Sequence, residues 1–178
     1  EAGKTAAAAA IISRMRHRGL VVDAFKATGV SLRRDIMAFE DAGARKSMLF
    51  TDLGVVTTSP RTGPALTRTM LTELAAGKPD VIVFELGDGL LGTYGVDAIL
   101  NCEDIRRAIT GLVLSANDPV AAWGGVQLLR ERFKVEPCMV TGPSTDNQAG
   151  VDIIEQQLKV AACNAISNPA ALGDALIE

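Results

Sequence analysis

The chain has 178 residues, a length typical of one domain, and its 18 basic and 21 acidic side chains give a net charge of −3. This balance argues against a general nucleic-acid-binding surface, and no apolar run approaches the length of a membrane-spanning helix. Hydrophobic residues make up 48% of the chain but aromatic residues only 4%, so the core must consist mainly of Ala, Val, Ile and Leu. Such residues suit a parallel sheet packed between helices.

The first predicted helix, Thr5–Arg18 with Gly19 after it, directly follows the sequence Glu1-Ala2-Gly3-Lys4-Thr5. Its Gly-Lys-Thr tripeptide fits the last three positions of the phosphate-binding pattern G-x-x-x-x-G-K-[ST], which joins a strand to a helix. The first glycine of that pattern and the strand before it would lie upstream of residue 1. The alternative is that the tripeptide simply begins an ordinary helix.

The three residues of this tripeptide have distinct expected roles. Gly3 allows the backbone to approach a phosphate closely, and the N–H groups of the helix N-terminus point at its oxygens. Lys4 would reach the terminal phosphates as a positive charge, and the Thr5 hydroxyl would ligate Mg2+. The predicted cofactors are therefore ATP and Mg2+, with Gly3, Lys4 and Thr5 binding the nucleotide.

Strand and helix patterns alternate along the whole chain. In order, we predict helix Thr5–Arg18, strand Leu20–Phe25, polar loop Thr28–Arg33, helix Asp35–Ala42, a short strand or extended segment Met48–Phe50, an ambiguous segment Leu53–Pro60, helix Leu66–Ala76, strand Asp80–Glu85, glycine-rich loop Leu86–Val96, helix Cys102–Ile109, strand Gly111–Ser115, helix Pro119–Phe133, strand Glu136–Val140, helix Ala149–Lys159, a short strand within Val160–Ile166 and helix Pro169–Ile177. This alternation predicts an α/β fold of three layers, α/β/α, with a mostly parallel sheet, in one domain over residues 1–178.

The clearest strand is Val81-Ile82-Val83-Phe84, whose uninterrupted apolar run predicts burial on both faces. In an open parallel sheet, ligands bind beyond the carboxyl ends of the strands. The polar residues at these ends are Lys26, Glu85, Asn117, Asp118, Thr141 and Ser144.

Glu85 is the most informative of these residues, because a carboxylate after a buried strand can hold Mg2+ directly or through water. Asp35 is a second candidate metal ligand, although capping of the helix that it begins is an equal alternative. Asp52 and Asp88 are weaker candidates. Lys26 would point into the same cleft and bind a substrate carboxylate or a γ-phosphate, unless it is a surface lysine at a strand end.

The three cysteines, Cys102, Cys138 and Cys163, have no metal-finger spacing, and their odd number argues against a disulfide framework. We therefore expect reduced thiols in a cytoplasmic protein.

Together these segments resemble the dethiobiotin synthetase-like branch of the P-loop NTPases. The phosphate loop, Ala24–Gly29 with its lysine, Arg34-Asp35, Val81–Gly89, Leu112–Gly125 and Met139–Gly142 follow the order of that family's segments. The resemblance implies a P-loop fold whose first strand is missing, catalytic roles for Lys4 and Lys26, a metal site of Thr5, Asp35 and Glu85, and nucleotide contacts at Thr141. The loop Glu85-Leu86-Gly87-Asp88-Gly89 departs from the family's E-G-A-G-G.

The function that this resemblance implies is Mg-ATP-dependent activation of a small carboxylate or carbamate by phosphoryl transfer, as in a ligase, with a small-molecule substrate and a homodimer. One alternative is a nucleotide-dependent switch ATPase of the same superfamily. Others are an amino-acid acylating protein of a related P-loop group, and a binding domain with a vestigial loop. No nucleic-acid or membrane partner is expected.

Overall fold

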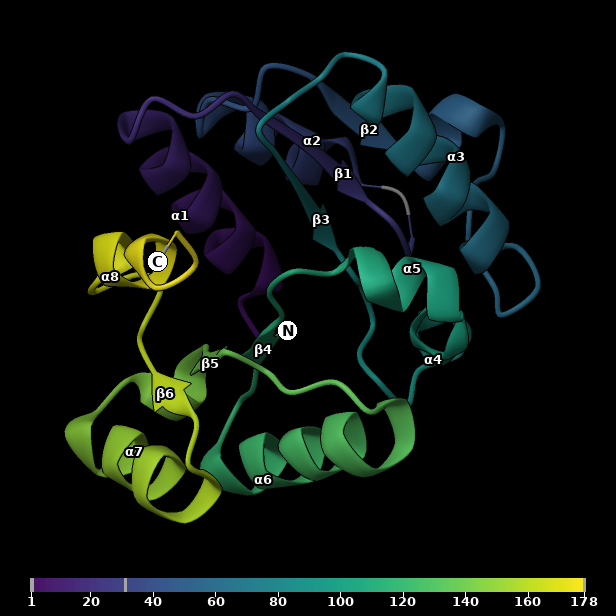
Figure 1. The fold of residues 1–178 in the computed structure, drawn as a ribbon. Helices are drawn as coiled ribbons and strands as arrows, with labels where there is room; N and C mark the ends of the chain where they lie inside the picture. The colour runs from purple at the N-terminus through teal and green to yellow at the C-terminus, as the bar shows by residue number, and fades with distance from the viewer. Residues whose placement is uncertain (1, 31, 178) are drawn as a thin grey trace.

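The computed structural model describes residues 2–30 and 32–177, so Glu1 and Ser31 of the predicted loops lie outside the described residues. The described strands form two parallel, three-stranded sheets (Figure 1). The first has the order β2-β1-β3 and the second β4-β5-β6. Their bounds are β1 Val22–Lys26, β2 Ser47–Leu49, β3 Val81–Glu85, β4 Val113–Ser115, β5 Met139–Thr141 and β6 Ala161–Ala162.

Helices connect the strands in the alternating manner that the sequence predicts. They are α1 Lys4–His17, α2 Arg33–Asp41, α3 Gly63–Ala75, α4 Val96–Asn101, α5 Glu103–Ala108, α6 Pro119–Leu128, α7 Gln148–Ile153 and α8 Pro169–Asp174. Two 3-10 turns, Phe50–Leu53 and Pro143–Thr145, lie between them, and π-helical turns at Leu129–Phe133 and Ile154–Leu158 extend α6 and α7. None of the helices in residues 2–30 and 32–177 is long and apolar enough to cross a membrane.

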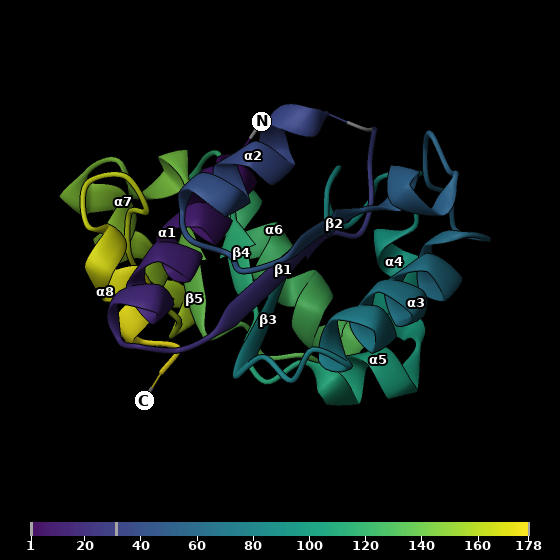
Figure 2. The same ribbon diagram turned by 90° about the horizontal axis from the view of Figure 1, so that it is seen from above.

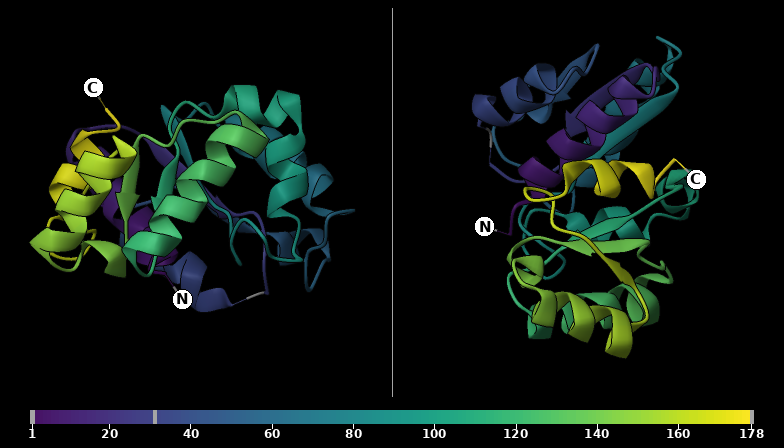
Figure 3. Two further views of the ribbon diagram at one scale, coloured as in Figure 1. Left: turned by 90° about the horizontal axis from the view of Figure 1, so that it is seen from below. Right: turned by 90° about the vertical axis from the view of Figure 1, so that its left-hand side faces the viewer.

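Helix α1 joins the two sheets through one hydrophobic core. Its buried Ile12 belongs to the same cluster as Ala24 of β1 and Met139 of β5, and α1 also packs against α2 and α8. Figure 2 shows α1, α2 and α8 gathered on one side of the strands and α3, α4 and α5 on the other. In Figure 3, α6 and α7 cover the second sheet. The layers are therefore α/β/α, and the predicted fold class is confirmed.

The strand register aligns the carboxyl ends of neighbouring strands within each sheet. Ala24 of β1 pairs with Val83 of β3, and Lys26 is the partner of Glu85 at the last position of the same ladder. In the second sheet, Ser115 at the end of β4 pairs with Thr141 at the end of β5. The carboxyl ends of these strands carry the residues that the sequence singles out.

Several predicted elements need correction. The helix α4, Val96–Asn101, was not predicted; it follows Gly95, whose φ of +98° makes the turn into it. Leu53–Pro60 holds no strand, only an isolated antiparallel bridge between Val30 and Thr57. The strand predicted at Glu136–Val140 begins only at Met139, after Pro137.

The burial predicted for the Val81–Phe84 run was also wrong. All four of these residues are half-buried, whereas every residue of β1 is buried. The reason is their place in the sheet, because β3 is an edge strand whose outer side faces a cavity.

Candidate functional site

The N-terminus of α1 is free to receive an anion. Gly3 precedes the helix with φ +79°, and its carbonyl accepts the first helical hydrogen bond from Ala7 N–H, at 2.9 Å. No side chain within the described part of the chain caps this end, and the first turn carries no acidic residue. The N–H groups of the first turn and the positive end of the helix dipole therefore suit a phosphate group.

The Thr5 hydroxyl, in the first turn of this helix, donates a hydrogen bond of 2.9 Å to Glu85 Oε2 at the end of β3. Glu85 is only 6% exposed. Burial raises the pKa of the Glu85 carboxyl, while the Thr5 hydrogen bond and the charge of Lys26 act in the opposite direction. The neighbours of Glu85 therefore offset only part of the cost of burying its negative charge. A bound cation would offset more of that cost.

Lys26 and Asp35 form a buried ion pair beside this contact. The Lys26 ammonium donates to Asp35 Oδ2, and both side chains are 9% exposed. Asp35 belongs to the first turn of α2, whose N-cap is Leu32, so Asp35 does not cap the helix that it was predicted to begin. Nor is Lys26 a surface lysine at a strand end. The structure thus brings the predicted Lys26, Asp35, Glu85 and Thr5 into one cluster.

Two glycines, Gly87 after β3 and Gly142 after β5, lie where backbone segments approach closely. A Cβ on Gly87 would lie 2.5 Å from the Thr28 carbonyl oxygen, and the Thr28 hydroxyl donates to the Gly87 carbonyl at 2.9 Å. A Cβ on Gly142, at φ +93°, would lie 2.5 Å from the Ala2 carbonyl oxygen. The loop after β5 therefore lies against the residue that precedes the start of α1.

The donor set fits Mg2+ in part. Thr5 and Glu85 place two hard oxygen donors side by side, and Mg2+ in nucleotide sites commonly takes one or two protein oxygens, with water and phosphate oxygens completing its shell. Within residues 2–30 and 32–177, no group of three His, Cys, Asp or Glu side chains could hold a metal alone. Asp35 is joined to Lys26, so its role as a metal ligand stays a prediction.

Lys4 extends from the start of α1 toward a cavity of about 1040 Å³ between the sheets. We call this cavity the inter-sheet slot; β3, β4, α1 and α6 line it. Among the residues that the structure describes, Lys4 has no side-chain hydrogen bond or ion pair, which leaves its charge available to a ligand.

The other predicted candidates have structural partners. The Thr141 hydroxyl is fully buried and accepts a hydrogen bond from Ala165 N–H at 3.1 Å, so its nucleotide contact stays a prediction. Asp118 caps α6 through Ala121 N–H at 2.8 Å, and Asp52 accepts from Leu49 N–H at 2.8 Å. These two carboxylates serve local structure.

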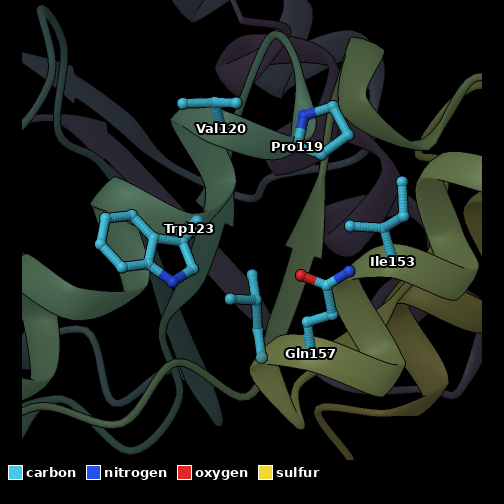
Figure 4. A pocket seen from close by; sticks show the side chains of 6 residues that line it. Pro119, Val120, Trp123, Ile153 and Gln157 are labelled. Carbon is cyan, nitrogen blue, oxygen red and sulfur yellow. The ribbon is translucent and has the colours of Figure 1, made fainter.

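A smaller hollow of about 440 Å³ lies between α6 and the helix formed by α7 and its π-helical extension. Figure 4 shows Val120, Trp123 and Ile153 around it, with Gln157 as the labelled polar side chain. Trp123 is 54% exposed. No residue of the Lys26 and Glu85 cluster lines this hollow, so it is separate from the candidate site.

Comparison with known proteins supports the fold. No protein-family model matches the chain, and no curated protein matches it. A similar solved structure is the signal recognition particle receptor FtsY from Elizabethkingia anophelis, with a TM-score of 0.64 and 12% sequence identity. The match covers 100% of this chain and 62% of that one, so this chain spans less than two thirds of the length of the FtsY structure. The fold is that of a P-loop NTPase.

Proposed function

We propose that this protein binds a nucleoside triphosphate with Mg2+ at the N-terminus of α1 and transfers or releases its γ-phosphoryl group. The observation that carries this proposal is the contact of Thr5 with Glu85. It is made at a helix N-terminus where, among residues 2–30 and 32–177, no side chain caps the helix and Lys4 has no side-chain partner. An anion-binding helix end beside a pair of hard oxygen donors suits a phosphate group that carries a metal ion.

Each residue of the cluster then has a definite task. The first-turn N–H groups and Lys4 bind phosphate oxygens, and Thr5 with Glu85 would hold Mg2+. When bound, Mg2+ supplies neutralisation of the phosphate charge. Lys26, positioned by Asp35, stabilises the negative charge on the transferred phosphoryl group or on an incoming carboxylate.

The finer proposal is activation of a small carboxylate or carbamate by ATP. An acceptor oxygen would attack the γ-phosphorus, the bond to the β-phosphate oxygen would break, and ADP would leave with the released electron pair. The buried ammonium of Lys26 at the end of β1 supports this reading, because such a cation can receive an acceptor oxyanion.

A second candidate is a slow nucleotide-dependent switch. It is favoured by the ion pair itself, since Asp35 already neutralises Lys26 and leaves little charge for an acceptor. In that case water replaces the carboxylate as the acceptor, and the nucleotide state would act through the segment that carries Asp35.

Formation of the nucleoside diphosphate, measured with and without a pool of small carboxylic and amino acids, separates the two candidates. The assay uses ATP and GTP in parallel, each with and without Mg2+. Carboxylate activation predicts that one acid raises turnover by about tenfold or more, a free-energy difference of about 1.4 kcal/mol in the barrier. Slow turnover that no acid changes would support the switch. No turnover and no nucleotide binding by folded protein would contradict both.

A further inference from the structure

We propose that Arg34 is a positioning residue of the candidate site, which takes the Asp35 carboxylate from Lys26 when an acceptor with one negative charge binds. The Lys26 ammonium is then free to receive the charge of that acceptor. This inference rests on the proposed function, because the acceptor is the carboxylate or carbamate of the phosphoryl transfer.

The Asp35 carboxylate lies between two cations. Its Oδ2 accepts a hydrogen bond from the Lys26 ammonium, and its Oδ1 lies 3.9 Å from Arg34 Nε. The second distance suits an ion pair but is too long for a hydrogen bond. A closure of about 1 Å would bring it to the length of a charge-assisted hydrogen bond. Each carboxylate oxygen therefore faces a different cation, and Lys26 holds the closer one.

The two cations differ in their exposure to solvent. The Lys26 side chain is 9% exposed, whereas the Arg34 side chain is 72% exposed. In the part of the chain that the structure describes, Arg34 donates no side-chain hydrogen bond, so its guanidinium can turn to Asp35 without losing another partner. The buried Lys26 charge would be uncompensated without Asp35, unless an anion takes its place. The exchange of Asp35 is therefore coupled to the arrival of an anion at Lys26.

The position of Arg34 in α2 does not serve the helix itself. Arg33 and Arg34 lie in its first turn, where the positive end of the helix dipole disfavours cations. Leu32 occupies the N-cap position, and its apolar side chain cannot accept a hydrogen bond from the first turn. Asp35 is the acidic residue of this turn and suits it. A cation placed against this local preference indicates a role in the neighbouring site.

The surroundings of Lys26 leave its ammonium near the phosphate-binding end of α1. A Cβ on Gly29 would lie 3.6 Å from Lys26 Cε, and one on Gly87 would lie 3.4 Å from the same atom, so two residues without side chains border the lysine. Lys26 and Glu85 are register partners at the ends of β1 and β3, and Glu85 accepts from the Thr5 hydroxyl. A freed ammonium therefore stays beside the proposed metal and phosphate positions.

The charges of the three side chains match a singly charged acceptor. Lys26 and Arg34 are positive and Asp35 is negative, so the group has a net charge of +1. A carboxylate or carbamate with one negative charge would neutralise this group without any transfer of a proton. Water is neutral and would not draw Lys26 away from Asp35. The exchange therefore favours an anionic acceptor over hydrolysis.

Unfolding measurements without nucleotide test whether Arg34 can replace Lys26 at Asp35. Arg34→Gln should affect the wild type little, because Lys26 compensates Asp35. In a Lys26→Met background, Arg34 is the cation left to offset part of the Asp35 charge, so Arg34→Gln should shift the unfolding equilibrium by about tenfold or more beyond its effect in the wild type. Arg33→Gln, in the same turn, is the matched control and should act equally in both backgrounds. Equal effects of Arg34→Gln in the two backgrounds would overturn the proposal. If Lys26→Met does not fold, Lys26→Gln provides a milder background for the same comparison.

Turnover tests the role of Arg34 in the reaction. With the pool of small carboxylic and amino acids, Arg34→Gln should lower kcat for acid-stimulated formation of the nucleoside diphosphate about tenfold, with an unchanged KM for the nucleotide. Arg34→Lys keeps the positive charge and should recover most of the loss, and Arg33→Gln should behave like the wild type. Unchanged acid-stimulated turnover of Arg34→Gln would overturn the proposal. If no acid stimulates even the wild type, carboxylate activation fails and so does the role of Arg34 in it, whereas the unfolding comparison separately shows whether Arg34 competes for Asp35.

Discussion

Thr5 and Glu85 are 80 residues apart in the sequence, and the Thr5 hydroxyl donates to Glu85 Oε2 at 2.9 Å. The contact ties the first turn of α1 to the carboxyl end of β3. It unites the two halves of the proposed site, a helix N-terminus that suits phosphate and a strand end that suits a metal ion.

Lys4→Ala should abolish nucleotide binding in the intact protein, because Lys4 supplies the positive charge at the phosphates. Its side chain has no structural partner among the described residues, so the melting temperature should change little. Lys46→Ala, which removes an exposed lysine just before β2, is the control and should bind like the wild type. Unchanged affinity of the Lys4 variant in a calorimetric titration would remove the phosphate-loop assignment.

Glu85→Gln should lower Mg-dependent turnover on the order of 100-fold while changing stability by less than about 1 kcal/mol. The amide oxygen can still accept the Thr5 hydrogen bond, but the negative charge for the metal is lost. Glu73→Gln, an exposed change on α3, is the control. A sharp fall in melting temperature with retained turnover would make Glu85 structural.

The raised pKa of Glu85 adds a pH dependence to this comparison. Burial makes the folded protein hold the Glu85 proton more tightly than the unfolded chain does, so ionisation costs stability as the pH rises. Without metal, Glu85→Gln should therefore be more stable relative to the wild type at pH 7 than at pH 4. Denaturant titrations at the two pH values measure this difference, and equal values would show that burial does not penalise the charge.

Lys26→Met should destabilise the fold by about 3 to 5 kcal/mol, because it leaves the Asp35 carboxylate buried without its partner. The double variant Lys26→Met, Asp35→Leu removes both charges and should recover most of that loss. Chemical denaturation measures both. If the double variant folds but has no turnover, the ion pair is needed for function. If the double variant keeps full turnover, the ion pair serves the fold alone.

Asp174 should make the fold sensitive to acid. Hydrogen bonds from Arg14 and Arg18 lower the pKa of the Asp174 carboxyl to about 2. Its stabilising effect is therefore present above the unfolded-state pKa of about 3.9 and is lost as the pH falls toward about 2.

Thermal melts of Asp174→Asn and wild type should accordingly differ at pH 7 and converge near pH 2. Asp41→Asn, an exposed change at the end of α2, is the control and should follow the wild type throughout. A difference between Asp174→Asn and wild type that stays constant across this range would contradict the assignment.

The sequence predicted the parts of the fold that depend on local patterns. The apolar run Val81–Phe84 forms β3, and the tripeptide Gly3-Lys4-Thr5 begins α1, both as expected from residue type and spacing. It did not predict that Val81–Phe84 would be half-buried, because burial depends on which strand lies beside it and not on the run itself.

The sequence predicted which residues belong to the candidate site, but not how they contact one another. Ion pairs such as Lys26 with Asp35 depend on the register of β1 and the entry of α2, which no sequence spacing fixes. A hint is available in the spacing, since Asp35 follows Lys26 by only nine residues, across the short connection between β1 and α2. The partner of the Thr141 hydroxyl, Ala165 N–H, depends on long-range packing in the same way.

Isothermal calorimetry measures whether the N-terminus of α1 binds a nucleotide. The titration uses the intact chain with ATP and GTP, each with and without Mg2+, and repeats them with Lys4→Ala. We predict Mg-dependent binding of at least one nucleoside triphosphate, and we predict that Lys4→Ala abolishes this binding. A folded protein that binds neither nucleotide, or that binds equally well without Lys4, would contradict it.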